Sequence, residues 1–352
     1  MSILEILQKA IACDAADIFL IAGLPVTFKA GGRQERLPGN FMRPDDITPL
    51  VDEIYTIGRR DRGRIENGLD DDFSFSVSHL GRFRVNVFRQ RGSLAAVIRV
   101  IRFGLPDPVQ LGIPESVLSL AENKKGLVLI TGAAGTGKST TLACMIDRIN
   151  RSRDCHIITM EDPIEYIHRH DRSIVTQREI SIDTPSYLEA LRSALRESPD
   201  VLLLGEMRDY DTISAAITAA ETGVLLLSTL HTSSAANTIN RILDVFPADQ
   251  QKQVKIQLAQ LLKGVVCQQL VPTVDGGQMA VFEIMKSTTA IQNMIREDKL
   301  HQLESAMQAG AAEGMCTMDG SLLKLYREKK ITRDTALLAC ANYENMARKL
   351  SL

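Results

Sequence analysis

The sequence contains one segment whose residue types could hold the phosphates of a nucleotide, TGAAGTGKST at residues 131–140. It fits the pattern G-x-x-x-x-G-K-[ST], in which glycines let backbone N–H groups turn inward around the phosphates. Lys138 can reach the β and γ oxygens, and the Ser139 hydroxyl can bind Mg²⁺. The predicted phosphate-binding residues are Gly132, Ala133, Ala134, Gly135, Thr136, Gly137, Lys138, Ser139 and Thr140.

The alternative is a glycine-rich turn that binds nothing, and the flanking elements decide against it. Residues 126–130 (GLVLI) are apolar throughout, which is typical of a buried strand. The residues after the loop repeat apolar side chains at helical spacing, namely Leu142, Met145, Ile146 and Ile149. The loop therefore joins a strand to a helix and places the phosphates at the helix N-terminus, where the helix dipole favours anions.

Further polar residues follow other predicted strands. Short apolar strands at 126–131, 156–160, 201–205 and 224–230 alternate with helical patterns, which implies a parallel sheet with helices on both faces. Ligands of such a sheet bind beyond the carboxyl ends of the strands. The residues just after each strand are therefore the candidates for chemistry.

Three strand ends carry acids or histidine. The strand 156–160 runs into EDPIEY, with carboxylates at Glu161, Asp162 and Glu165 that could bind Mg²⁺ through water or orient the attacking water. A solvated acidic loop is the alternative. The strand 201–205 runs into Glu206, which is the Walker B arrangement, although many strands end in a charge.

His231 follows the fourth strand and would face the γ-phosphate as a sensor. A histidine that only caps a helix or bonds at the surface is the alternative.

A stretch of arginines without acids covers residues 81–102. Arginines on a solvated strand face need no further explanation, but Arg99 lies in the otherwise apolar IRVI, so we expect it to be buried and to need an anion. A phosphorylated ligand across a subunit interface would supply one, with the arginine acting in trans. The six positions are Arg82, Arg84, Arg89, Arg91, Arg99 and Arg102.

Composition limits the class of protein. With 352 residues the chain can form two domains, and 41 basic against 43 acidic residues give a net charge of −2, which argues against a generally basic nucleic-acid binder. The six cysteines form no C-x-x-C pair, so free thiols in a reducing cytosol are the simple interpretation. No apolar run reaches the roughly 18 residues that span a bilayer, so we expect a cytoplasmic protein that meets the membrane through partners.

The chain divides at residues 102–116, which hold three prolines and two glycines and suit a hinge. Upstream, an amphipathic helix begins the chain, residues 45–66 are expected to be helical, and DFSFSVS and RFRVNVF alternate with period two. This region should be α+β on an antiparallel sheet. After about residue 245 the pattern is mostly helical, broken by a hairpin at Asp275-Gly276-Gly277.

A set of motifs, in this order and spacing, resembles the type II/IV secretion ATPase superfamily. The motifs are TGAAGTGKST, MEDPIEY, LRESPDVLLLGEMRD and AAETGVLLLSTLHT. With GRFRVNVFRQRG before them and STTAIQNMIRED after them, the chain most resembles the type IV pilus retraction (twitching motility) ATPases. The resemblance covers nearly the whole chain.

The resemblance implies an α/β fold with a RecA-like P-loop ATPase core, a parallel sheet and a PAS-like α+β domain. The domains would be 1–101, a linker at 102–116, and 117–352 with a helical part from about 287. It implies a homohexameric ring with ATP and Mg²⁺ between subunits, peripheral at the inner membrane. The implied partners are the pilus platform protein and a paralogous pilus ATPase, with no nucleic acid.

The resemblance also implies residue roles. Glu165 would activate water, Glu206 would act on Mg²⁺ through water, and His231 would belong to the histidine box. Arg84 and Arg99 match the arginines supplied in trans.

Two departures bear on activity and direction. Val224 stands where the family usually has histidine, and Gln292 replaces the first arginine of AIRNLIRE, a segment tied to retraction. Extension and secretion members carry a cysteine-rich metal module after the histidine box, where this chain has only Cys267, which favours retraction. A pilus assembly or secretion ATPase and a nucleotide-binding regulator stay as alternatives. A DNA translocase is a third, poorly supported because the chain has no Trp and 5% aromatic residues.

Overall fold

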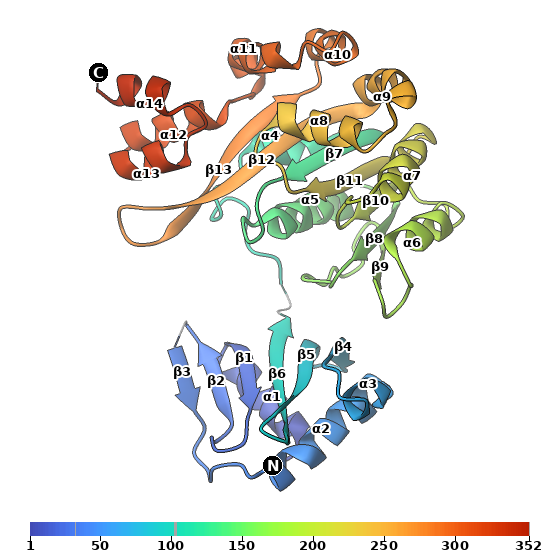
Figure 1. Ribbon diagram of the computed structural model, residues 1–352, viewed down its shortest axis with the longest axis vertical. Coiled ribbons are helices and arrows are strands. Elements are labelled where there is room, and N and C mark those ends of the chain that lie inside the picture. Colours follow the sequence, from blue (N-terminus) through green and yellow to red (C-terminus); the bar gives the residue numbers. More distant parts are fainter. Residues whose placement is uncertain (32, 102–103, 352) are drawn as a thin grey trace. The chain divides into compact units, whose positions relative to one another are not determined.

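The computed structural model describes residues 1–31, 33–101 and 104–351 (Figure 1). They form two compact units, Met1–Gly104 with Glu165–Ile167, and Leu105–Ile164 with His168–Leu352. The predicted linker spans this boundary, and its use as a hinge stays a prediction. The first two residues of the linker, 102 and 103, lie outside the described residues, and the predicted Arg102 is one of them.

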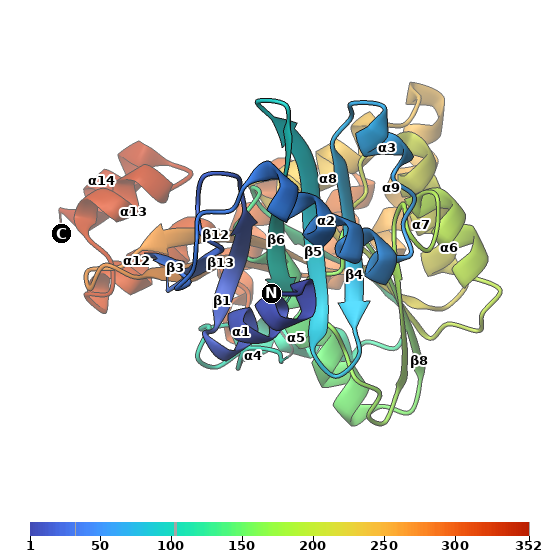
Figure 2. The same cartoon turned by 90° about the horizontal axis from the view of Figure 1, so that it is seen from below.

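The N-terminal unit is an antiparallel six-stranded sheet with helices α1 (Ile3–Ala12) and α2 (Pro44–Gly58) packed on it (Figure 2). A capping box between Ser2 and Glu5 begins α1. The short α3 covers Gly63–Glu66. The strand order is β3-β2-β1-β6-β5-β4, with β1 Ala15–Leu20, β2 Thr27–Ala30, β3 Arg33–Arg36, β4 Asp71–Val77, β5 Gly81–Gln90 and β6 Ser93–Ile101.

The predicted alternation of β4 and β5 builds the core of this unit. Phe75 lies opposite Phe83 in the register, and their rings stack with centroids 5.4 Å apart. Phe73 lies opposite Val85 and is also buried. The α+β prediction is therefore confirmed, while the PAS-like assignment stays a prediction.

The C-terminal unit is built on a seven-stranded sheet in the order β13-β12-β7-β11-β10-β8-β9. All neighbours pair in parallel except β12 and β13, which form the predicted antiparallel hairpin. The four predicted strands are confirmed, and β9 is an additional strand at the edge of the sheet. The strands are β7 Gly126–Thr131, β8 His156–Glu161, β9 Ile174–Glu179, β10 Val201–Leu204, β11 Leu225–Leu230, β12 Leu262–Pro272 and β13 Gln278–Lys286.

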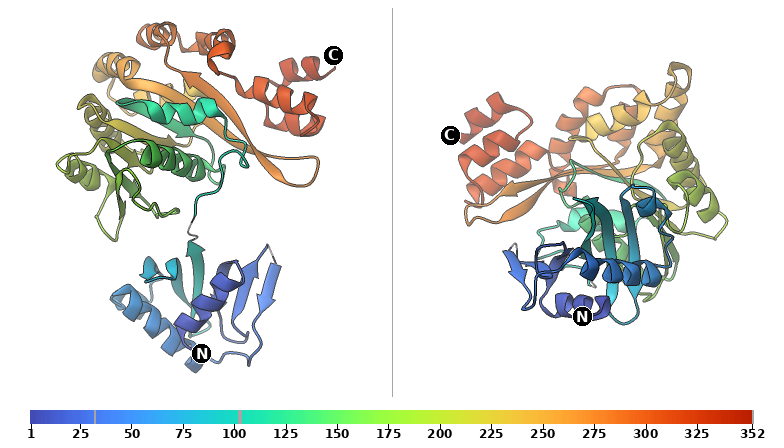
Figure 3. Two further views of the ribbon diagram at one scale, coloured as in Figure 1. Left: turned by 180° about the vertical axis from the view of Figure 1, so that it is seen from behind. Right: turned by 60° about the horizontal axis from the view of Figure 1, so that its bottom comes forward.

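Helices cover both faces of this sheet, as the alternation predicted (Figure 3). One face packs on α4 (Glu115–Leu118) and α5 (Lys138–Ser152). The other packs on α6 (Tyr187–Ala194), α7 (Tyr210–Glu221), α8 (Ala235–Asp244) and α9 (Ala248–Leu261). Ser186 begins α6 by accepting a hydrogen bond from the Glu189 N–H, and the Glu189 carboxylate pairs with Arg192.

The helical C-terminal region is confirmed. Its helices are α10 Thr289–Arg296, α11 Leu303–Ala309, α12 Met318–Arg327, α13 Arg333–Ala339 and α14 Tyr343–Leu350. They add buried side chains such as Ile291, Met307 and Leu322 to the core beneath α7, α8 and α9. The region therefore belongs to the same compact unit as the phosphate loop.

Candidate nucleotide-binding site

The phosphate loop leaves β7 and enters α5 in a shape that requires its glycines. Gly132, Gly135 and Gly137 have φ values of +144°, +77° and +86°, which side chains rarely adopt. A Cβ on Gly132 would lie 2.3 Å from the Gln268 carbonyl oxygen. The loop therefore rests directly on the backbone of β12.

Lys138 is held inside the loop as the first residue of α5. Its side chain is buried, and its Nζ donates to the carbonyl oxygens of Gly132 and Ala133, both at 2.8 Å. These contacts hold the ammonium within the ring of backbone groups that would surround a phosphate. Ser139 and Thr140 follow in the first turn of α5.

Gln268 on β12 is a loop contact that the motif analysis missed. Its side chain is buried, and its Oε1 accepts from the Thr141 hydroxyl at 2.8 Å. Its Nε2 lies 2.9 Å from where a Cβ on Gly137 would stand. A polar side chain inside an otherwise apolar strand is the signal that could have found it.

Glu206 and His231 lie together at the ends of β10 and β11. The Glu206 Oε2 is 3.5 Å from His231 Nε2, and its Oε1 is 2.6 Å from Arg208 Nε. Since β11 lies between β7 and β10, His231 ends the strand between the phosphate loop and Glu206. The sheet therefore brings Glu206 and His231 to the edge where the phosphate loop begins.

Tyr187 adds a hydroxyl that sequence reasoning did not single out. A Cβ on Gly205 would lie 2.7 Å from its hydroxyl oxygen. Burial raises the pKa of Tyr187, and the nearby carboxylates of Glu206, Asp162 and Glu161 raise it further. The tyrosine stays protonated and offers a neutral donor among acids.

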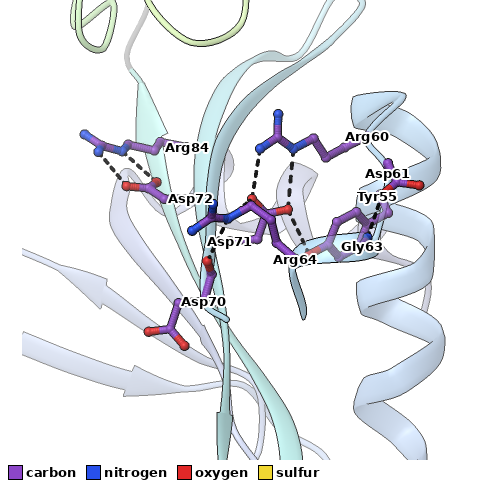
Figure 4. A network of polar contacts seen from close by, with 9 residues as sticks. All are labelled: Tyr55, Arg60, Asp61, Gly63, Arg64, Asp70, Asp71, Asp72 and Arg84. Atoms are coloured by element: carbon purple, nitrogen blue, oxygen red, sulfur yellow. Dashed lines mark hydrogen bonds and ion pairs between the residues drawn. The ribbon is translucent and has the colours of Figure 1, made fainter. Parts of the chain in front are cut away.

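The candidate residues Arg84 and Arg99 belong to the N-terminal unit. Arg84 pairs with Asp72 through two hydrogen bonds of 2.9 and 2.6 Å (Figure 4). The prediction that Arg99 is buried was wrong: its side chain is 69% exposed and pairs with Asp17 at 3.0 Å. Strand alternation explains this, because the neighbouring Ile98 takes the buried face of β6.

The catalytic roles of these arginines stay predictions. Glu165 also stays a prediction, and the structure groups it with the N-terminal unit.

A cavity of about 320 Å³ adjoins the start of α5. It is lined by residues 109–113 of the predicted linker, by Gly137, Thr140 and Thr141, and by the β12–β13 hairpin at Gln268. Its walls combine apolar side chains with a few polar groups, as is typical of small-molecule sites. It adjoins the phosphate loop at Gly137 and Thr140.

The residues around the loop fit Mg²⁺. The donors are the Ser139 hydroxyl of the loop and the Glu206 carboxylate, and the carboxylates of Glu161 and Asp162 lie near Tyr187 as Glu206 does. Mg²⁺ usually binds one or two protein groups together with substrate phosphates and water. Within the described residues no group of three or more His, Cys, Asp or Glu is arranged to hold a metal, and such a cage is not what Mg²⁺ needs here.

A glycine loop between a central parallel strand and a helix, with an acid and a histidine at the neighbouring strand ends, defines a RecA-like P-loop ATPase. Residues 75–329 match the family described as Type II/IV secretion system protein. The chain thus belongs to the type II/IV secretion ATPase family, among the type IV pilus retraction ATPases.

Similar proteins agree with this membership. The chain is 44% identical to the type IV pilus retraction ATPase PilT of Pseudomonas aeruginosa, over 96% of this chain and 97% of that protein. It is 41% identical to a twitching motility protein of Neisseria gonorrhoeae, over 98% of this chain and 92% of that protein. It aligns with the crystal structure of the pilus retraction motor PilT with bound ADP at 45% identity and a TM-score of 0.91, covering 99% of each chain.

Among the described residues no helix has the length and apolarity to cross a membrane.

Proposed function

We propose that this protein is a homohexameric motor that hydrolyses ATP to retract type IV pili. The observation that carries the proposal is the contact of Glu206 with His231 beside a formed phosphate loop. The relatives that bear the pilus retraction names align over nearly the whole chain. The absence of a cysteine-rich module after His231 supports retraction over secretion.

The phosphate loop would bind the β and γ phosphates through its backbone N–H groups at the start of α5. On binding, Lys138 would exchange the carbonyl oxygens of Gly132 and Ala133 for phosphate oxygens. The cavity beside α5 would take the ribose or base. ATP therefore gains contacts at both ends while the protein gives up two lysine hydrogen bonds.

Hydrolysis here needs positioning and charge neutralisation more than covalent chemistry. Glu165 would accept the proton of the attacking water, and Arg84 and Arg99 of a neighbouring subunit would stabilise the developing phosphoryl charge. Ser139 and, through water, Glu206 would hold Mg²⁺, which neutralises phosphate charge when bound. His231 would report the γ-phosphate to Glu206, because it already contacts that carboxylate.

Movement would come from the segment 102–116, which joins the two units. The partners would be the pilus platform protein at the inner membrane and a paralogous pilus ATPase, so the motor would reach the membrane through them.

The test combines hydrolysis with pilus imaging. Wild type, Lys138→Ala and Glu206→Gln are purified for phosphate release and are also supplied to the pilus-bearing host after deletion of this gene. We expect wild type alone to hydrolyse ATP rapidly and to withdraw labelled pili. Pilus withdrawal by the Glu206→Gln variant would refute the mechanism, and cells without pili in the gene's absence would indicate assembly. Hydrolysis that rises several-fold with single-stranded DNA would indicate a translocase.

A further inference from the structure

A row of polar side chains crosses three strands of the sheet at the base of the phosphate loop. Thr131 of β7 lies opposite Cys267 of β12, and Cys267 lies opposite Glu283 of β13. All three residues are buried, and the Thr131 hydroxyl donates to the Cys267 sulfur at 3.1 Å. Since opposed residues in a sheet point to the same face, the row leads from the residue before Gly132 to Glu283.

Glu283 joins the beginnings of two helices. Its Oε1 accepts from the Ala235 N–H at 2.8 Å, and its Oε2 accepts from the Met318 N–H at 3.3 Å. These residues are the first of α8 and of α12. The N-cap side chains of Ser234 and Thr317 accept from N–H groups further along each helix, at Asn237 and Gly320. Glu283 therefore accepts from helix N–H groups that these caps do not bond.

The two helices belong to different functional parts of the unit. α8 begins four residues after His231, and α12 belongs to the C-terminal helical region. A carboxylate interacts favourably with both N-terminal dipoles. Movement of either helix away from Glu283 would leave a buried carboxylate oxygen without its donor, which is costly.

Cys267 completes the connection on the loop side. Burial raises the pKa of its thiol, and the neighbouring Glu283 raises it further, so the thiol stays protonated. The next residue on the strand, Gln268, touches the loop at both ends, through its carbonyl at Gly132 and its side chain at Gly137. A shift of the loop would therefore change its contacts with β12 directly.

We propose that Glu283 is a positioning residue that couples the phosphate loop to α8 and α12, so that bound nucleotide changes how firmly both helices are docked. The inference rests on nucleotide binding at the loop, which is part of the proposed function. The difference between states comes from Lys138, whose bond to the Gly132 carbonyl would be released when phosphate binds. Thr131, the first residue of the row, precedes that glycine.

The experiment is hydrogen exchange of the full-length assembly with and without ADP, read by mass spectrometry. In wild type we expect ADP to slow exchange at residues 132–140 and also at the first turns of α8 and α12. Glu283→Gln keeps the shape of the side chain but places an N–H₂ group against one helix N–H. In this variant the slowing at 132–140 should remain, while the effect at the two helices falls at least tenfold.

Asp319→Asn is the matched control. Asp319 is also buried and accepts from the Ala341 and Asn342 N–H groups, but the row does not include it. This variant should keep the ADP effect at α8. Thr131→Val removes the hydroxyl that donates to Cys267 but leaves Glu283 and its two helix N–H donors unchanged, and it should lose the effect as Glu283→Gln does.

The outcomes separate the two proposals. Equal ADP effects at α8 and α12 in wild type, Glu283→Gln and Thr131→Val would overturn the coupling. Slowing at 132–140 alone in wild type would also overturn it and leave nucleotide binding intact. No slowing at 132–140 in wild type would overturn both.

Discussion

Gly132 offers the sharpest test of the phosphate loop, because the structure shows what an added methyl group would meet. In Gly132→Ala the new Cβ would lie 2.3 Å from the Gln268 carbonyl oxygen and 2.8 Å from the Thr136 hydroxyl. The first of these is backbone within a paired strand and cannot turn away. The loop itself must therefore move.

Gly135→Ala is the matched control in the same loop. Gly135 also has a positive φ, +77°, but an added Cβ would have nothing within 4 Å. Its substitution costs only the backbone conformation, about 1–2 kcal/mol. If all of that strain opposed ATP binding, kcat/KM would fall by about tenfold.

The magnitude for Gly132→Ala follows from the distance. Real Cβ contacts essentially never lie below 3.0 Å, so the loop must shift by at least 3.0 − 2.3 = 0.7 Å at this point. Misplacement of catalytic groups by about 1 Å costs on the order of 100-fold. We expect kcat/KM for ATP, measured by phosphate release, to fall about 100-fold or more.

Far-ultraviolet circular dichroism and thermal melting check that both variants fold. A value for Gly132→Ala within threefold of that for Gly135→Ala would refute the packing argument.

Three further predictions concern other residues. Glu206→Gln should lower hydrolysis by about 100-fold, because a charged group near the phosphates is lost, while ADP affinity measured by calorimetry changes little. Asp71→Asn should lower the free energy of unfolding, measured in urea, by about 2–3 kcal/mol. The reason is that fully buried Asp71 accepts a hydrogen bond from Tyr55 and pairs with the partly exposed Arg60 (Figure 4). The same change at the exposed Asp72 should cost about 0.5 kcal/mol, and equal effects of the two changes would contradict the role of this network. Burial lowers the pKa of His168 from 6.5 to about 4. Between these two pH values the unfolded chain therefore binds a proton at His168 that the folded chain does not bind. Stability should therefore fall by up to about 3 kcal/mol between pH 6.5 and 4, and urea titrations of His168→Gln should lack this component.

The parts of the site that the sequence predicted are those encoded within one short segment. The phosphate loop, its strand and its helix are contiguous, so spacing alone predicted them, and Glu206 and His231 were found because each ends an apolar strand. The sequence could not establish that Glu206 contacts His231, because the contact depends on the pairing of β10 with β11. Arg99 was misjudged for a different reason: alternation along β6 buries Ile98 and exposes Arg99, so the apolar residues around it did not indicate that it is buried.

Contacts between distant segments were missed. Gln268 bonds Thr141, which is 127 residues away, and no local pattern links them. Tyr187 occupies a helical position where an aromatic side chain needs no special explanation, and only the folded structure places its hydroxyl beside Gly205. Spacing within a segment therefore predicts which groups bind phosphate, while strand order determines what supports them.

Buried polar residues in apolar strands are the sequence signal that would have narrowed this gap. The segments LKGVVCQQLVP and QMAVFEIMK are apolar enough to form core strands, yet they carry Gln268 and Glu283 at positions that prove buried. An acid or amide in a core strand is destabilising unless other groups bond it, so its presence indicates specific donors. Here those donors are Thr141 beside the phosphate loop and the first N–H groups of α8 and α12. The β12–β13 hairpin therefore does more than extend the sheet, because its polar residues place the loop and two helices against one another.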